Sequence, residues 1–179
     1  MATREKVTLE AFKQYVELPE NSDRLFELIN GEIVEKMPGR ASNSQIHDVI
    51  VGEVRPFCKA NKLPCYTAGA DGTFDVLGQS YAPDFAYKQT PMSSDYPDSV
   101  APLWIVEVIS PTDETGHVRT KRNTYLQAGI LYWEIYPVEQ SVDVYVPGQP
   151  VKTYGINDTL DVGELLPGFT LAVRDLFEQ

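Results

Sequence analysis

The stretch Leu103-Trp104-Ile105-Val106-Glu107-Val108-Ile109 decides the fold, because an apolar, β-branched run of this length is typical of a buried strand. Glu107 is the exception within the run. A glutamate is almost never fully buried without a partner, since removing a charge from water is costly unless another group compensates it. The sequence therefore predicts a central strand that carries one carboxylate in need of a partner.

A second acid lies in an earlier strand of the same kind. The segment 82–87 is short and apolar, and Asp84 follows Pro83 inside it. Side chains alternate along a strand, so Asp84 shares a face with the small residues Ala82 and Ala86, which leave room beside it. Consecutive elements usually pack as neighbours, and we therefore expect Asp84 and Glu107 to lie close together.

A lysine is the third member of this candidate site. A helix is predicted over 117–128, where Lys121 shares one stripe with Val118 and Tyr125, three residues before it and four after it. Lys121 therefore points where an apolar side chain would be expected. An inward ammonium on the element after the central strand can reach both acids.

The remaining pattern predicts a mixed α/β fold in which one sheet is flanked by helices. Asn30-Gly31 is the strongest hairpin signal in the chain, because both turn positions need positive φ. Thr8 is a plausible N-cap for the first helix, and Pro56 weakens the last turn of the second. We expect further helices over 9–18 and 44–60, the hairpin 25–29 with 32–35, a polar loop between Lys88 and Pro102, and strands over 65–68, 72–76, 130–136, 141–146, 151–154 and 169–173.

Length and composition favour one globular domain over residues 1–179. The chain is 42% hydrophobic and 11% aromatic, which argues against disorder. Its apolar runs are far shorter than the roughly 18 residues of a membrane span, and its polar start does not resemble a signal peptide. Cys58 and Cys65 lack metal-type spacing, so reduced thiols are expected. We therefore expect a cytoplasmic protein without membrane contact.

The net charge of −11 disfavours a protein whose main role is to bind nucleic acid without specificity, because phosphate binding needs clustered Lys and Arg. A local basic patch is still compatible with this balance. Arg119, Lys121 and Arg122 are close enough in the sequence to supply one.

The two acids and the lysine are compatible with two different roles. Paired carboxylates repel each other unless a cation intervenes, and Mg²⁺ is commonly held by one or two carboxylates together with water and substrate phosphate. A nearby ammonium could then orient a water molecule or neutralise developing charge. The alternative is a buried acid–lysine network with no catalysis.

Several motifs in combination resemble the PD-(D/E)XK nuclease superfamily and, within it, a large prokaryotic family of putative restriction endonucleases. The resemblance covers nearly the whole chain. It is carried by Phe26-Glu27-Leu28-Ile29-Asn30-Gly31-Glu32, by Pro83-Asp84, by Ile105-Val106-Glu107-Val108-Ile109-Ser110-Pro111, by Lys121 with Tyr125, by Ala128-Gly129-Ile130-Leu131-Tyr132-Trp133 and by Leu166-Pro167-Gly168-Phe169.

The resemblance implies a restriction-endonuclease-like core, with a mixed central β-sheet flanked by helices and an N-terminal helix and β-hairpin. It also implies a phosphodiesterase site for Mg²⁺ or Mn²⁺. Asp84 and Glu107 would bind the metal, the carbonyl of Val108 would be a further ligand, and Glu27 would complete the site. The superfamily's usual lysine position is occupied by Ile109, and Lys121 is the substitute.

Three further residues follow from the resemblance. His47 matches a histidine common in the family, although a capping or solvent-exposed histidine is the more common role for such a residue. Tyr125 and His47 would contact the metal ligands without binding the metal themselves. His117 occupies a position where the family often has an aspartate. The contact that such an aspartate would make with the site residues is therefore missing or supplied by another residue in this chain.

The leading hypothesis is a metal-dependent DNA endonuclease in which activated water attacks the phosphodiester. The alternative is a noncatalytic module of the same fold that binds nucleic acid or protein. A glycosidase that uses Asp84 and Glu107 is a weaker third hypothesis, because an inward lysine is not part of that chemistry. A homodimer is also expected, since nucleases that cut both strands often pair symmetrically.

Overall fold

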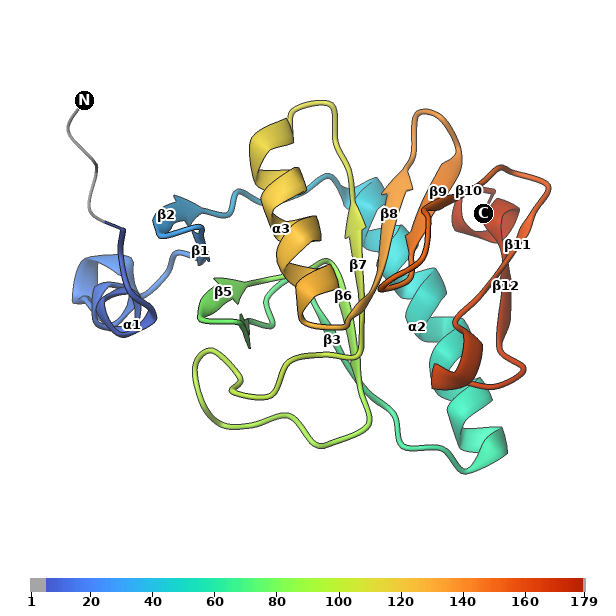
Figure 1. Ribbon diagram of the computed structural model, residues 1–179, viewed down its shortest axis with the longest axis horizontal. Coiled ribbons are helices and arrows are strands. Elements are labelled where there is room, and N and C mark those ends of the chain that lie inside the picture. The colour runs from blue at the N-terminus through green and yellow to red at the C-terminus, as the bar shows by residue number, and fades with distance from the viewer. Residues whose placement is uncertain (1–5, 179) are drawn as a thin grey trace.

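The computed structural model of the protein describes residues 6–178, in which the strands form two main sheets and a two-stranded pair, accompanied by three α-helices (Figure 1). The helices are α1 (Leu9–Val16), α2 (Ala41–Asn61) and α3 (Thr115–Gln127), with 3₁₀ turns η1 (Pro19–Asn21), η2 (Gly163–Leu165) and η3 (Val173–Leu176). The strands are β1 (Phe26–Ile29), β2 (Glu32–Glu35), β3 (Tyr66–Gly69), β4 (Phe74–Val76), β5 (Gln79–Tyr81), β6 (Phe85–Lys88), β7 (Trp104–Val108), β8 (Leu131–Tyr136), β9 (Ser141–Tyr145), β10 (Lys152–Tyr154), β11 (Thr159–Asp161) and β12 (Thr170–Ala172).

The larger sheet has six strands in the order β10-β9-β8-β7-β6-β3. Strands β7 and β8 are parallel, and the other neighbours pair antiparallel, so the sheet is mixed as predicted. A parallel pair needs a crossover connection, and α3 provides it. Glu107 pairs with Glu134 in the register of β7 and β8. The two acids therefore share one face of the sheet.

Strand β7 separates two apolar clusters. Trp104, Val106 and Val108 pack on the side of α2, in a cluster that also contains Ile50 and Val54. Ile105 faces the other way, toward Tyr125 of α3 and Tyr132 of β8. Because side chains alternate along the strand, Glu107 lies on the α3 face with Ile105. The strand is buried along its whole length, as the opening motif predicts.

The smaller sheet has the order β2-β1-β5-β4 and brings the N-terminal hairpin beside the core. Asn30 and Gly31 have φ values of 51° and 81°, and Ile29 pairs with Glu32 across them, which confirms the two-residue turn. Thr8 caps α1 by accepting a hydrogen bond from the backbone N–H of Ala11 at 3.2 Å. Helix α3 packs against β1, so this sheet and the crossover helix are in contact.

Several sequence expectations differ from the structure. The strands form two main sheets and the pair β11–β12, where one sheet was expected. Strands β5 and β11 were not predicted at all. Asp84 precedes β6, because Pro83 cannot donate a ladder hydrogen bond and the strand begins only at Phe85. Helix α2 begins at residue 41 and continues past Pro56, which is exposed and tolerated where Val54 and Cys58 anchor the helix to the core.

The long loop after β6 is confirmed, and a buried ion pair holds it. Lys88 at the end of β6 donates to Asp98 at 2.7 Å, and both side chains are almost fully buried. Asp98 also accepts the backbone N–H groups of Ser93 and Val100. None of the described helices has the length and apolar character that a membrane crossing requires.

Candidate active site

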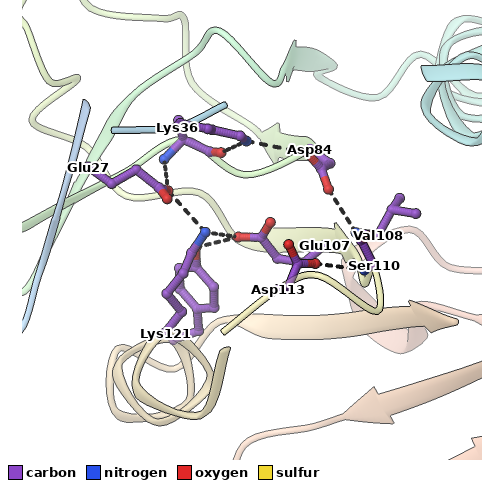
Figure 2. Close-up of polar contacts among 10 residues, drawn as sticks. Glu27, Lys36, Asp84, Glu107, Val108, Ser110, Asp113 and Lys121 are labelled. Atoms are coloured by element: carbon purple, nitrogen blue, oxygen red, sulfur yellow. Dashed lines mark hydrogen bonds and ion pairs between the residues drawn. The ribbon is translucent and has the colours of Figure 1, made fainter. Parts of the chain in front are cut away.

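Three elements and two connecting segments bring three acids and two lysines together on the α3 side of β7 (Figure 2). Glu27 comes from β1, Glu107 from β7 and Lys121 from α3, whereas Asp84 lies directly before β6. Sequence reasoning named these four residues as one site, and the contacts below join them. The fifth member, Lys36, follows β2.

Lys121 is the centre of the cluster. Its ammonium lies 2.5 Å from Oε1 of Glu107 and donates to Oε1 of Glu27 at 2.9 Å. Only 10% of its side chain is exposed. Burial by itself lowers the pKa of an ammonium, but the carboxylates of Glu107 and Glu27 outweigh that effect and raise the pKa of Lys121 above its ordinary value. Lys121 is therefore charged at neutral pH.

Glu107 uses only one of its two oxygens for these contacts. Oε1 also accepts a hydrogen bond from the hydroxyl of Tyr125 at 3.0 Å, and Oε2 accepts none from residues 6–178. Burial, together with the nearby charge of Asp84, raises the pKa of Glu107 to about 7 against the opposing effect of Lys121. Figure 2 shows the free oxygen pointing away from Lys121. Glu107 thus has a vacant acceptor and a proton that can leave near neutral pH.

Glu27 is held more firmly in its ionised form. Its Oε1 accepts the backbone N–H of Ala82 at 2.8 Å in addition to Lys121. Burial acts to raise the pKa of Glu27, but the charges of Lys121 and Lys36 and the bond from Ala82 lower it overall. Glu27 therefore serves as a fixed negative charge that orients Lys121.

Asp84 is joined to the site through the backbone of β7. Its Oδ2 accepts the N–H of Val108 at 2.8 Å, which places the carboxylate beside the residue that follows Glu107. Its Oδ1 lies 3.3 Å from the ammonium of Lys36, which also donates to the carbonyl of Ala82. Lys36 was missed by sequence reasoning, because it follows an exposed strand and nothing local marks it as a partner of an acid 48 residues away.

The two histidines lie outside this cluster. His47 on α2 faces the exposed Asp48 at 3.2 Å, and its ring lies 6.2 Å from that of Phe85, the residue after Asp84. His117 approaches Glu114 at 3.3 Å and Glu32 at 4.0 Å. Neither imidazole contacts an acid of the site among the described residues. Tyr125, in contrast, binds Glu107 directly.

The oxygen donors fit a hard divalent cation in part. Within residues 6–178, no three His, Cys, Asp or Glu side chains form a set that could hold a metal ion alone. Asp84 and the free oxygen of Glu107 are two carboxylate donors near the same backbone segment, and Mg²⁺ is commonly held by one or two carboxylates with water and substrate oxygens completing the shell. Asp84, Glu107 and the carbonyl of Val108 could hold such an ion.

A second buried acid lies beside the site and was also missed. Glu134 is completely buried in β8 and receives Nε and Nη2 of Arg122 at 2.8 and 2.7 Å. The hydroxyls of Tyr136 and Tyr145 donate to it at 2.7 and 3.2 Å. The same signal that singled out Glu107, an acid inside an apolar strand, is present at 131–136 and could have identified Glu134.

The fold is shared with a protein of known crystal structure. The structure is similar to the crystal structure of a putative nuclease belonging to DUF820 from Anabaena variabilis, with a TM-score of 0.81. The match covers 96% of this chain and 97% of the other chain at 24% identity, which shows a shared fold.

The family follows from the sequence itself. The model of the Uma2 family, described as "Putative restriction endonuclease", matches residues 12–174. The chain belongs to this family, as the motifs in the sequence indicate. A search of curated proteins finds no match.

Proposed function

We propose that the protein is a divalent-metal-dependent endonuclease that hydrolyses phosphodiester bonds of DNA. The observation that carries this proposal is the vacant oxygen of Glu107 beside Asp84, next to a charged lysine that is already fixed in place. Membership of a family of putative restriction endonucleases supports the substrate class.

Each residue has a role that follows from its contacts. Asp84 and Glu107 would hold Mg²⁺ or Mn²⁺ with the carbonyl of Val108. When bound, the cation supplies Lewis-acid polarisation of the phosphoryl group and lowers the pKa of a water ligand. Lys121 presents an ammonium, held by Glu27, where negative charge develops on the phosphoryl oxygens.

Lys36 and Tyr125 act through the acids. Lys36 keeps the Asp84 carboxylate oriented toward β7, and its ammonium balances the negative charge that three acids place in a small volume. Tyr125 donates to the oxygen of Glu107 that faces Lys121, so the other oxygen is left for a ligand. Both are positioning residues in this proposal.

A calorimetric titration with MgCl₂ or MnCl₂ tests the metal assignment. Wild-type protein should show saturable binding, and Asp84→Asn, which keeps the shape of the side chain, should lose most of it. The matched control is Asp175→Asn on η3, an exposed aspartate far from the site in the sequence, which should titrate like wild type. Identical titrations of wild type and Asp84→Asn would remove Asp84 from the metal site.

Cleavage of a supercoiled plasmid tests the reaction. We expect nicked and linear products with Mn²⁺ or Mg²⁺, none with EDTA, and none from Asp84→Asn. Wild-type protein that leaves the plasmid intact with either metal would contradict the proposal.

The noncatalytic binding module is the second candidate. One observation favours it: Lys36 and Lys121 already neutralise Asp84 and Glu107, as in a structural ion network. This candidate predicts an intact plasmid together with titrations that show no metal binding. The two proposals therefore give opposite results in the same pair of experiments.

A further inference from the structure

A pocket of about 310 Å³ lies where β7 and β8 end, beside the candidate active site. The loop after β7 forms one wall, α3 forms the other, and the end of β8 closes it. Figure 2 shows Ser110 and Asp113 of this loop immediately beyond Val108. The lining residues, which define the α3 pocket, are Ile109, Ser110, Pro111, Asp113, Thr115, Val118, Arg119, Arg122 and Tyr136.

The α3 pocket is continuous with the acid–lysine cluster along the chain. Ile109 directly follows β7 and stands two residues after Glu107, a step of about 7 Å in extended chain. Arg122 directly follows Lys121 on α3, and Val118 precedes that lysine by one turn. A polymer whose reacting group lies at Lys121 would place its neighbouring unit at the α3 pocket.

The guanidinium of Arg122 is fixed at the pocket. Glu134 binds Nε and Nη2 in a bidentate contact, and the group also lies over the ring of Tyr145 at 4.8 Å. The hydrogen bonds to Glu134 raise the pKa of Arg122 above its ordinary value. Nη1 donates to no group within residues 6–178, and 26% of the side chain is exposed. The Nη1 edge of the Arg122 guanidinium is therefore free to donate to a ligand and is held in one orientation.

Arg119 adds a second cation on the same wall. It is exposed, and it forms no ion pair with the described residues. The chain contains seven arginines, and only Arg119 and Arg122 lie within one helical turn of each other. The pocket also contains one acid, Asp113, whose carboxylate is engaged by the backbone N–H of Ser110 at 2.6 Å. On a chain of net charge −11, the two arginines are a local concentration of positive charge, of which Arg122 is held in a fixed orientation.

We propose that the α3 pocket binds the DNA backbone phosphate that neighbours the scissile one, with Arg119 and Arg122 as donors and Glu134 as the residue that positions Arg122. The planar guanidinium suits this ligand, because its N–H groups match the oxygens of a phosphate. The inference rests on the proposed function and adds a subsite that fixes the position of the DNA strand relative to the acid–lysine cluster.

Salt-dependent DNA binding tests the subsite without cleavage. The probe is a fluorescein-labelled 20-base-pair duplex, and anisotropy is measured in EDTA from about 50 to 200 mM salt, a range over which phosphate contacts dominate affinity. Arg119→Ala should weaken binding about tenfold and reduce the slope of log K against log salt by about 0.9, the value for one lost phosphate contact. Arg174→Ala on η3 is the matched control and should retain the wild-type slope.

Arg122→Lys tests the second donor with its charge retained, since removing the side chain would leave Glu134 buried without a partner. The expected result is weaker binding with an unfolding midpoint close to wild type. Glu134→Gln should weaken binding in the same way, because the guanidinium is then no longer fixed. A wild-type slope in Arg119→Ala together with wild-type affinity in Arg122→Lys would overturn the subsite, while plasmid cleavage would still support the endonuclease.

Inorganic phosphate separates this subsite from a site for small anions. If phosphate alone raises the unfolding midpoint of wild type but not of Arg119→Ala, and DNA affinity is unchanged between them, the pocket serves a free anion and the DNA assignment is wrong. If wild type binds no DNA at any salt concentration, the subsite is also wrong, and cleavage and metal titration then decide the proposed function separately.

Discussion

Glu107 and Glu134 are paired residues on two parallel strands, yet hydrogen-bond donors satisfy the two carboxylates to different extents. Glu134 is completely buried, and four donors from Arg122, Tyr136 and Tyr145 occupy both of its oxygens. Glu107 retains 8% exposure and leaves Oε2 without a donor from the described residues. Two acids in the same register therefore differ in whether an oxygen is left for a further partner.

The difference lies in how each charge is compensated. A bidentate arginine with two hydroxyls satisfies a carboxylate fully, and nothing is left for a ligand. One ammonium shared with Glu27 compensates Glu107 only in part, which is why burial still raises the pKa of Glu107 to about 7. An incompletely satisfied acid can accept a cation, whereas a fully satisfied one holds its neighbours in place.

The largest expected effect is on stability. Glu134→Ala should lower the free energy of unfolding by about 3 to 5 kcal/mol, because Arg122 then loses its buried partner. Glu107→Ala should cost less, since Lys121 keeps Glu27. Urea unfolding at pH 8 measures both. Equal losses would show that the two acids are equally structural.

The next effect is on cleavage. Glu107→Gln should reduce the initial rate of plasmid nicking by about 10²- to 10³-fold, the scale of one preorganised electrostatic group. Glu134→Gln should reduce it by less, because that residue acts only through Arg122. A larger loss for the Glu134 variant would reverse the assignment of the two acids.

The third effect is a pH dependence of stability in EDTA. The folded pKa of Glu107, about 7, lies above its ordinary value of 4.5, so between these values the folded state binds a proton that the unfolded state has released. The contribution of Glu107 to the free energy of unfolding must therefore fall as pH rises from about 4.5 to about 7 and stay constant above. The difference between wild type and Glu107→Gln, from urea unfolding at each pH, isolates this fall. A pH-independent difference would contradict the raised pKa.

The smallest effect concerns single hydroxyls. Tyr125→Phe removes the only hydroxyl that donates to Glu107 among the described residues and should cost about 1 kcal/mol at pH 8, where the acid is ionised. It should also move the pH transition upward, because a donor to the carboxylate favours its charged form. Tyr136→Phe is the matched control and should cost less, since Glu134 keeps three other donors. A larger loss of stability in Tyr136→Phe than in Tyr125→Phe would contradict the conclusion that hydrogen-bond donors satisfy Glu134 more fully than Glu107.

The convergence of Asp84, Glu107 and Lys121 could be predicted because each signal is local. A charge inside an apolar run is visible without any structure, and the order strand, strand, helix makes the three elements neighbours. Lys36 could not be found in this way, since its contact with Asp84 depends on how the two sheets dock. Glu134 was available to the same reasoning and was overlooked.

The hairpin of β4 and β5 shows a different limit. Leu77 and Gly78 form its two-residue turn with φ values of 53° and 78°. Such a turn normally has Asn, Asp or Gly at its first position, and Leu77 gives no such signal. The bond from Gly78 N–H to Oδ1 of Asp75 at 2.8 Å supports the turn instead. A local side-chain hydrogen bond thus compensates for an unfavourable residue at the turn, which the dipeptide alone does not reveal.

Lys121 joins Glu27 of the smaller sheet to Glu107 of the larger sheet across 94 positions of sequence. The cluster cannot assemble before residue 121 has been synthesised and α3 has packed against β1. The hairpin and the central strand are therefore synthesised before the lysine that joins them. The acid–lysine cluster forms only when the two sheets have docked, and Lys121 is the last of its five members to be synthesised.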